Sequence, residues 1–272
     1  MTSSLPPLDG TVDLGDAVAG FARDGHALVT GLATASEVAA YRHHVQAAAS
    51  RRNPEPPPLQ ARDTYGKAFL QSMNLWRIDD AVQAFVWSPR FASVAAALLG
   101  VEGVRLYHDQ ALFKEPGGGP TPWHQDQVYW PLDTDRTITM WMPLVDVADE
   151  VGSMTFASSS HLEGLAPFDI SDASERSVAD VLEERGLATH TYGALRPGDA
   201  TFHAGWTLHR AGPNPSAAVR EVMTIIWYAD GARATEPENP YQGIDLRMWL
   251  VGTEPGAVAD GPRNPRLWPV GG

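Results

Sequence analysis

The apolar positions of the first hundred residues recur mainly at helical spacing. A short helix is expected between Asp13, which can cap it, and Gly25, which ends it. Thr34 and Glu37 have the spacing of a capping box, so a longer helix is expected over about residues 35–51. The other elements expected in this half are strands at 26–32 and 68–76, a proline-rich loop at 53–59, and helices at 80–88 and 90–99.

Beyond residue 100 the pattern changes to short apolar runs separated by turn residues, which are typical of β-strands. A polar insert from 161 to 187 is expected to hold a helical part at 177–184, and the proline-rich tail from residue 231 is expected to be a loop. Strands are expected at 104–114, 128–131, 137–145, 153–157, 190–192, 199–202 and 219–228.

This order of elements predicts a mainly β fold with flanking helices, built as a sandwich or barrel. The helices of about residues 1–100 are expected to cover the outside of a sheet core at about 101–230. No internal repeat separates the two halves, so a single domain over 1–272 is expected.

Composition narrows the function classes. The chain has 272 residues and is 43% hydrophobic, so it can bury a core without covalent cross-links. Its 20 Lys and Arg against 33 Asp and Glu give a net charge of −13, which argues against nucleic acid or an anionic membrane as the main partner. The absence of cysteine excludes disulfides, thiolate metal sites and cysteine nucleophiles.

No targeting or membrane signal is expected from the pattern. The first ten residues lack the basic start of a signal peptide. The longest nearly apolar run, 91–101, is shorter than the ~20 residues that a membrane span needs. A cytoplasmic protein, monomeric or homodimeric, is therefore expected.

The segment Thr-Pro-Trp-His-Gln-Asp at 121–126 carries the strongest local chemical signal. Residues two apart on a strand share a face, so the side chains of His124 and Asp126 are expected to converge. They are two of the three ligands of the facial two-histidine, one-carboxylate site that binds Fe(II) and leaves coordination positions open. Taken alone, this triplet also fits an exposed polar loop after a glycine-rich turn.

A second segment supplies a third candidate ligand and a candidate anion site. His209 closes a largely apolar run, where it can face the first two residues across a barrel or be a buried core histidine. Arg220 follows eleven residues later, at the start of a strongly β-like strand. A buried arginine is costly unless it meets an anion, and its planar guanidinium can hold a carboxylate with two hydrogen bonds. A surface charge at the strand entry is the alternative.

The order of these and neighbouring motifs resembles a known family. The chain carries Trp-His-Gln-Asp at 123–126, Tyr-Trp-Pro at 129–131, Trp-x-Pro-Leu-x-Asp at 141–146 and Gly-Ser-Met at 152–154, followed by His209 and Arg220. This arrangement is similar to that of the phytanoyl-CoA dioxygenase family, in motif detail from about residue 106 to 227. The resemblance implies a double-stranded β-helix (jelly roll, cupin-like) and a non-haem oxygenase that uses Fe(II), 2-oxoglutarate and O₂.

The resemblance also implies roles for individual residues. His124, Asp126 and His209 match the iron ligands, and Arg220 matches the arginine that binds the far carboxylate of 2-oxoglutarate. Trp141 matches an aromatic residue beside the co-substrate.

One further match and one departure concern the same co-substrate. Gln110 matches a position that contacts the co-substrate. Two residues after the distal histidine the family often has Ser or Thr, whereas this chain has Ala211. The co-substrate is then expected to lose one hydrogen bond, worth ~1 kcal/mol, unless Gln110, Thr139 or a water replaces it.

Several further residues are candidates for contact with the substrate. His108 shares a strand face with Gln110, and His203 shares the parity of His209 if no bulge intervenes. Tyr129 and Trp130 follow the metal motif and either hold a flat apolar substrate or pack in the core. Gln71, Asn74 and Trp76 are candidates for the opposite wall.

The function expected from this site is oxidation of a C–H bond in a small organic molecule, with release of succinate and CO₂. Hydroxylation is the first expectation, with epimerisation, desaturation or cyclisation as alternatives. In halogenating relatives a small residue replaces the carboxylate ligand and leaves room for chloride. This chain has Asp126 at that position, so halogenation is disfavoured.

The alternatives are a non-catalytic metal-binding jelly roll and an acyl-CoA hydroxylase of the same family. A third, a metal-dependent hydrolase or isomerase, is disfavoured for lack of a suitably placed glutamate base. Clustered Lys and Arg for a CoA phosphate are absent near the expected mouth, so a free secondary-metabolite intermediate is favoured. The insert from 161 to 190 is either a lid that sets selectivity or a solvated helix face.

Overall fold

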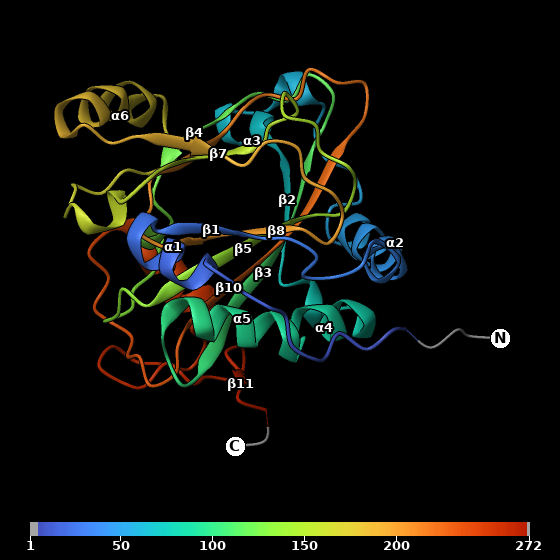
Figure 1. The fold of residues 1–272 in the computed structure, drawn as a ribbon, viewed down its shortest axis with the longest axis vertical. Helices are drawn as coiled ribbons and strands as arrows, with labels where there is room; N and C mark the ends of the chain where they lie inside the picture. Colours follow the sequence, from blue (N-terminus) through green and yellow to red (C-terminus); the bar gives the residue numbers. More distant parts are fainter. Residues whose placement is uncertain (1–4, 271–272) are drawn as a thin grey trace.

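Two antiparallel sheets face each other in the computed structural model, which describes residues 5–270, with the backbone alone at 64 and 65 (Figure 1). The larger sheet has the strand order β1 (His26–Val29), β8 (Ala200–Ala204), β5 (Thr137–Pro143), β10 (Arg220–Ala229), β3 (Val104–Lys114) and β11 (Arg266–Trp268), with β2 (Leu70–Met73) also paired to β3. The smaller sheet has the order β4 (Thr121–His124), β9 (His209–Ala211), β6 (Met154–Ala157) and β7 (Thr189–Thr191).

The chain passes back and forth between these sheets. From β3 to β10, strands β3, β5, β8 and β10 lie in the larger sheet, while β4, β6, β7 and β9 lie in the smaller one. This alternation is the connectivity of a jelly roll. The predicted fold class, mainly β with flanking helices on a double-stranded β-helix, is confirmed.

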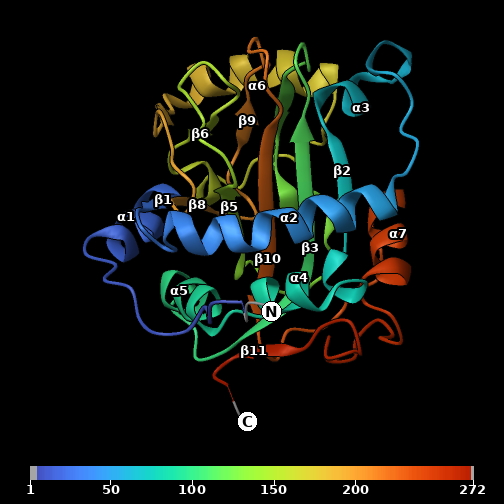
Figure 2. The ribbon, with the colours of Figure 1, turned by 90° about the vertical axis from the view of Figure 1, so that its right-hand side faces the viewer.

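The helices before residue 100 cover the outer face of the larger sheet (Figures 1 and 2). They are α1 (Ala17–Asp24), α2 (Ala35–Arg52), α4 (Asp80–Val86) and α5 (Pro89–Leu99), with a short α3 (Thr64–Ala68) and the 3₁₀ turns η1 (Leu59–Ala61) and η2 (Leu75–Arg77) between them. The capping box predicted at Thr34 and Glu37 forms, and Gly100 ends α5 in the left-handed conformation, as a C-cap glycine does.

Alternation along the central strands separates the core from the site. Met140 and Met142 of β5, and Ile225 of β10, point outward into the main hydrophobic core beneath the helices. The intervening residues of these strands point inward, toward the smaller sheet, and Thr139 and Trp141 are examples. The period-2 pattern therefore places polar candidates on the face between the two sheets.

One predicted strand and one predicted helix cap are corrected by the structure. The strand expected at 128–131 is instead a 3₁₀ turn, η3 (Asp126–Tyr129), in which the amide of Gln127 donates to the carbonyl of Gly205. The apolar run there is buried without being extended, and a short run cannot distinguish the two. Asp13 does not cap α1, because its side chain accepts from the amide of Gly15 and the helix begins after Asp16.

The tail beyond residue 231 also differs from the prediction. It contains helix α7 (Pro240–Met248), with Asn239 accepting from the amide of Gln242 as N-cap, and strand β11. The helix of the polar insert, α6 (Asp172–Arg185), is longer than expected because Ser171 caps it earlier. A 3₁₀ turn, η4 (Ser160–Leu162), begins that insert.

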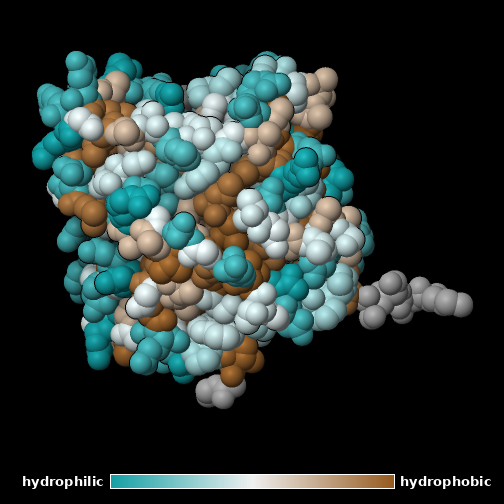
Figure 3. Space-filling view, in the orientation of Figure 1, coloured by the Kyte–Doolittle hydropathy of each residue, from teal (hydrophilic) through white to brown (hydrophobic). Residues whose placement is uncertain are grey.

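By length and composition, Asp80–Leu99 is long and apolar enough to span a membrane. In the fold this stretch forms two separate helices, α4 and α5, and 61% of it is buried against the sheet. The surface seen in Figure 3 is mostly polar, with apolar patches in the middle of that face. Burial in the core accounts for the apolar character of this segment.

Candidate active site

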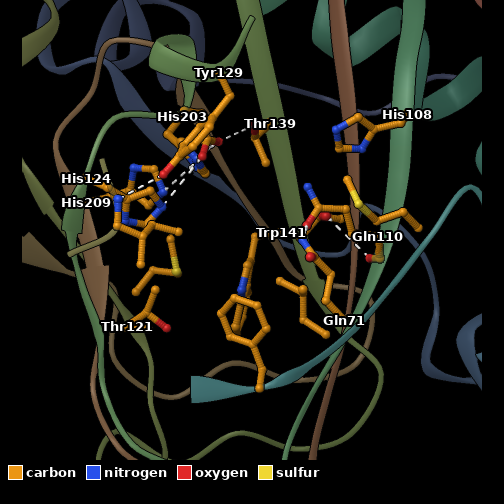
Figure 4. A pocket seen from close by; sticks show the side chains of 18 of the residues that line it. Gln71, His108, Gln110, Thr121, His124, Tyr129, Thr139, Trp141, His203 and His209 are labelled. Carbon is orange, nitrogen blue, oxygen red and sulfur yellow. Dashed lines mark hydrogen bonds and ion pairs between the residues drawn. The ribbon is translucent and has the colours of Figure 1, made fainter. Parts of the chain in front are cut away.

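A cavity of about 580 Å³ lies between the two sheets. Figure 4 shows His124 and His209 on one side of it, facing Gln71, Gln110 and His108 on the other. The first two come from the smaller sheet and the last two from β3 of the larger one. Both sheets therefore contribute polar side chains to one enclosed space.

His124, Asp126 and His209 meet at one point of the cavity wall. His124 and His209 are directly opposite each other in the β4–β9 ladder, and Asp126 begins η3 just after β4. Asp126 Oδ1 lies 3.6 Å from His124 Nε2 and 3.7 Å from His209 Nε2. The three ligand atoms lie within 4.8 Å of one another, a spacing that can hold a metal ion.

Hydrogen bonds fix both imidazoles in the form a metal requires. Nδ1 of His124 donates to the carbonyl of Pro122 at 2.8 Å, and Nδ1 of His209 donates to the carbonyl of Thr207 at 2.9 Å. Each Nε2 therefore presents its lone pair to the cavity. Burial lowers the pKa of both residues, so both rings are neutral at neutral pH.

The second oxygen of Asp126 is held in place from the larger sheet. Its Oδ2 accepts from the hydroxyl of Thr139 at 2.8 Å and from Nε2 of His203 at 3.1 Å. Although burial favours the neutral acid, the neighbouring His209 and the hydrogen bond from His203 outweigh it and hold the pKa of Asp126 well below its usual range. A carboxylate fixed in this way keeps Oδ1 directed at the histidines.

His203 lines the cavity as predicted, but for a different reason. It lies on β8 in the larger sheet, whereas His209 lies on β9 in the smaller sheet, so the two share no strand parity. The chain crosses between the sheets at Gly205, where a Cβ atom would come within 2.3 Å of the hydroxyl of Thr137. The crossing brings the His203 and His209 rings to a centroid separation of 4.2 Å.

Arg220 is a buried cation without an anionic partner among the described residues. It is 2% exposed at the start of β10 and lines the same cavity. Its Nη1 donates to the carbonyl of Gly152 at 2.7 Å, its guanidinium lies 5.3 Å from the ring centroid of Trp141, and its Nε has no partner. Burial lowers the pKa of Arg220 to about 9. An anion entering the cavity would remove this cost.

Glycine and alanine keep the space beside Arg220 open. Gly152 has a φ of +65°, and a Cβ atom there would lie 2.8 Å from the carbonyl of Gly212 and 3.0 Å from Arg220 Nη1. Ala211 lines the cavity and pairs with Thr121 across the β4–β9 ladder. The Thr121 side chain also lines the cavity, so it offers a hydroxyl on the strand next to Ala211.

Nine of the candidate residues predicted for the co-substrate and substrate line this cavity: Arg220, Trp141, Gln110, Thr139, His108, Tyr129, Trp130, Gln71 and His203. Two placements change their interpretation. Gln71 donates to Gln110 at 2.6 Å, so these two amides form a pair. The Thr139 hydroxyl donates its proton to Asp126, so Thr139 lies at the Asp126 carboxylate rather than at Arg220.

The candidate wall residues Asn74 and Trp76 do not line the cavity. The Trp76 indole donates to Asn74 Oδ1 at 2.9 Å, and the amides of Leu75 and Trp76 donate to Asp109, which is fully buried. This cluster caps η2 in the interior, so the prediction for these two residues is wrong.

Sequence reasoning missed the contribution of the tail. Four residues at or just after α7 line the cavity: Tyr241, Ile244, Asp245 and Trp249. Arg210 and Thr121, each next to or near a candidate ligand, were also missed. The helical spacing of Tyr241, Asp245 and Trp249 is the one signal in the sequence that could have placed them on a common face.

The insert from 161 to 187 lies against strands β4 and β9, which carry His124 and His209. Glu175 of α6 accepts from the amide of Trp123 at 2.9 Å and pairs with Arg210 at 3.0 Å. The amide of Ile170 donates to the Tyr129 hydroxyl at 2.8 Å. The insert therefore forms part of the cavity wall, and Ile170 lines it.

Comparison with known proteins agrees with this geometry. Residues 21–222 match the family profile described as phytanoyl-CoA dioxygenase (PhyH). The chain belongs to the phytanoyl-CoA dioxygenase family. The family resemblance read from the motifs is thereby confirmed.

Individual relatives are more distant. The chain is 29% identical over 156 residues to a protein of Stutzerimonas stutzeri named as a probable alpha-ketoglutarate-dependent hypophosphite dioxygenase, covering 55% of this chain and 53% of that one. It is 27% identical over 170 residues to a methylphosphonate hydroxylase of Gimesia maris, covering 58% and 62%. The matched part thus spans less than two thirds of these curated relatives.

Among solved structures, the epimerase SnoN in complex with Fe³⁺, alpha ketoglutarate and nogalamycin RO superposes with a TM-score of 0.74 and 28% identity. The match covers 92% of this chain and 97% of that one. It supports the jelly-roll assignment over nearly the whole length.

Proposed function

We propose that this protein is a non-haem Fe(II)- and 2-oxoglutarate-dependent dioxygenase that oxidises a C–H bond of a small organic molecule. The main support is that one cavity holds both a His-Asp-His cluster and a buried arginine that has no counter-ion among the described residues. A metal site alone explains the first feature and leaves the second costly. An anionic, metal-chelating co-substrate accounts for both.

In this proposal each group of residues has a distinct task. His124, Asp126 and His209 hold the iron through their Nε2 and Oδ1 atoms, while Thr139 and His203 fix the carboxylate. Bound iron, 2-oxoglutarate and O₂ together supply the oxidising power, yielding succinate and CO₂. Keeping both imidazoles neutral and the carboxylate ionised gives the cluster one negative charge, which suits a divalent cation.

The far carboxylate of 2-oxoglutarate is assigned to Arg220. Trp141 covers the guanidinium on one side, and the carbonyl of Gly152 fixes Nη1, so Nε is available in a defined direction. The Gln71–Gln110 pair offers further polar contacts on the facing wall. Arg220 and Trp141 are both buried, so this part of the cavity is shielded from water.

One structural neighbour and the charges of the cavity favour an organic substrate over a phosphorus oxyanion. SnoN was solved with nogalamycin RO, a ligand far larger than hypophosphite. A phosphorus oxyanion like those named for the two curated relatives would need a second free cation, and the other lining arginine, Arg210, is already paired with Glu175. We therefore favour a secondary-metabolite intermediate, hydroxylated or, alternatively, epimerised, desaturated or cyclised.

The same proposal covers the partner, the location and the domain organisation. The net charge of −13 supports a small-molecule partner over nucleic acid, in a cytoplasmic setting. The helices before residue 100 share the main core with the larger sheet, which supports a single domain over 1–272.

An anaerobic titration of Fe(II)-loaded protein with 2-oxoglutarate tests the proposal. We expect the weak visible charge-transfer band of a chelated 2-oxo acid, and succinate on admission of O₂ with ascorbate present. His124→Ala and Asp126→Ala should abolish iron binding measured by calorimetry in protein whose circular dichroism is unchanged. Iron bound at full affinity without a band would instead support a non-catalytic metal-binding jelly roll.

A further inference from the structure

The charged side chains that line the cavity do not all have partners. Apart from histidines, the described lining residues include Asp63, Asp126, Asp245, Arg210 and Arg220. Asp126 belongs to the metal cluster, Asp63 caps α3 by accepting from a backbone amide, and Arg210 pairs with a carboxylate of α6. Asp63 is exposed to solvent, so Arg220 and Asp245 are the two buried or partly buried charges of the lining without an opposite charge.

Asp245 is held by neutral donors only. Its Oδ2 accepts from the hydroxyl of Tyr107 at 2.8 Å, and the Trp249 indole is a second donor. No Lys or Arg among the described residues forms an ion pair with it. Tyr107 keeps its proton, because burial raises its pKa well above the usual value. The carboxyl group is thus oriented by neutral donors and has no charged side chain as partner among the described residues.

The two unpaired charges lie at different ends of the cavity. Arg220 is opposite Lys114 in the β10–β3 ladder, and Tyr107, which holds Asp245, lies seven residues back along β3. At ~3.3 Å per residue this is about 23 Å along the strand. We call the surroundings of Arg220, Trp141 and Ala211 the Arg220 end, and those of Asp245, Trp249 and Tyr129 the Asp245 end.

We propose that Asp245 binds a positively charged nitrogen of the substrate, so that the substrate class is an organic ammonium compound with an apolar body. This inference rests on the proposed function, which assigns the Arg220 end to the co-substrate. The same physical argument applies to both ends, since a half-buried charge that lines a cavity without a counter-ion is stabilised by a ligand of opposite sign.

The walls of the Asp245 end suit such a ligand. Trp249, Trp130 and Tyr129 line the cavity, and aromatic faces attract cations. Tyr241 packs edge-on against Tyr129 at 5.3 Å between ring centroids. An ammonium group at Asp245 would lie among these rings while its apolar body extends toward the metal cluster. The acidic surface further favours approach of a cation.

A neutral hydroxyl group is the competing ligand, because it too can donate to a carboxylate. Two probes with one skeleton separate these possibilities: tryptamine carries an ammonium group where tryptophol carries a hydroxyl. Each is titrated by calorimetry into anaerobic Fe(II)-loaded protein with saturating 2-oxoglutarate. The charge-transfer band is recorded in the same samples.

The variants are Asp245→Asn, which retains an acceptor for Tyr107, and Asp169→Asn as a matched control. Asp169 accepts from the Tyr241 hydroxyl at 3.4 Å near the mouth but does not line the cavity. The Asp169→Asn variant therefore removes the same charge from the same region of the protein. Comparing the two separates direct contact from long-range attraction.

We expect wild-type protein to bind tryptamine at least about 10-fold more tightly than tryptophol. Asp245→Asn should abolish this preference and Asp169→Asn should keep it. Equal affinities, no tryptamine binding at millimolar concentration, or a preference that survives Asp245→Asn would each overturn the inference. Loss of the charge-transfer band in wild type would overturn the proposed function instead, so the two failures are distinguishable.

Discussion

The two ends of the cavity are built in different ways. The Arg220 end is formed by inward-facing residues of long central strands, and Arg220 and Trp141 are each 2% exposed. The Asp245 end is formed by a 3₁₀ turn, the insert and a tail helix, whose Tyr241 and Ile244 are 45% and 47% exposed. A co-substrate common to a whole family suits the rigid end, whereas a particular substrate suits the adaptable one.

Side-chain hydrogen bonds and ring contacts, rather than strand ladders, join the segments of the Asp245 end. Asn239 donates to the carbonyl of Val128 at 3.1 Å, which ties the start of α7 to η3. The Tyr241 hydroxyl reaches Asp169 of the insert at 3.4 Å. The strands at the Arg220 end, by contrast, are joined by continuous ladders, since β10 pairs with both β3 and β5 along most of its length. Local opening is therefore expected at the Asp245 end first.

The largest predicted effect concerns the rigid end. Arg220→Ala should weaken 2-oxoglutarate binding by at least about 30-fold, because truncating one partner of a buried charge pair costs roughly 2–5 kcal/mol. Iron affinity should change little, since Arg220 does not contact the His-Asp-His cluster. Titration of the charge-transfer band, with Arg210→Ala as a control that removes an arginine already paired with Glu175, measures this. Unchanged co-substrate affinity would place the carboxylate elsewhere.

The second prediction concerns the free energy of unfolding, which should depend on pH through Asp245. Burial raises the pKa of Asp245 from 3.8 to about 7, and the hydrogen bond from Tyr107 only partly offsets this. The titratable groups facing it are Tyr107 and, across Trp249, His108, whose pKa burial lowers to about 3. Both stay neutral between pH 4 and 9, so the change in that range belongs to Asp245.

The sign follows from linkage. The folded state keeps a proton on Asp245 that the unfolded state has released, so ionising it lowers stability as pH rises from about 4 to about 7. Asp245→Asn should therefore be more stable than wild type by up to about 4 kcal/mol at pH 8, with little difference near pH 4. Urea unfolding of both proteins at the two pH values measures this. A difference that is the same at both values would show that the carboxyl ionises normally.

The Arg220 end could be predicted from sequence because its residues have fixed spacing on regular elements. The bounds of β3 match the predicted 104–114, and alternation correctly placed Gln110 inside. His124 and Asp126 converge although the chain leaves the strand between them, because η3 turns Asp126 back toward β9. The motif thus predicted proximity even where the strand argument did not hold.

The Asp245 end was not predictable in the same way. Pro240 and Gly243 make α7 look like a loop, and two of its large apolar residues, Ile244 and Met248, are each 47% exposed. No apolar stripe marks this helix as part of the fold. Its position depends on caps and on contacts with η3 and β3, which are distant in sequence. Tertiary packing of this kind leaves only the four-residue spacing of Tyr241, Asp245 and Trp249 as a signal, with no apolar stripe to support it.

The smallest predicted effect tests how the Arg220 end replaces the hydroxyl group missing at Ala211. Ala211→Ser adds a donor beside the space next to Arg220, so 2-oxoglutarate should bind about 5-fold more tightly, corresponding to one hydrogen bond of ~1 kcal/mol. Thr121→Val should weaken binding by a similar factor, because Thr121 is the cross-strand partner of Ala211 and lines the cavity there. If one hydroxyl substitutes for the other, the double variant should bind like wild type. The contrary outcome is that Ala211→Ser gives no gain in affinity while Thr121→Val weakens binding equally with and without it. That outcome would show that the co-substrate carboxylate does not reach β9, and that Arg220 holds it from β10 alone.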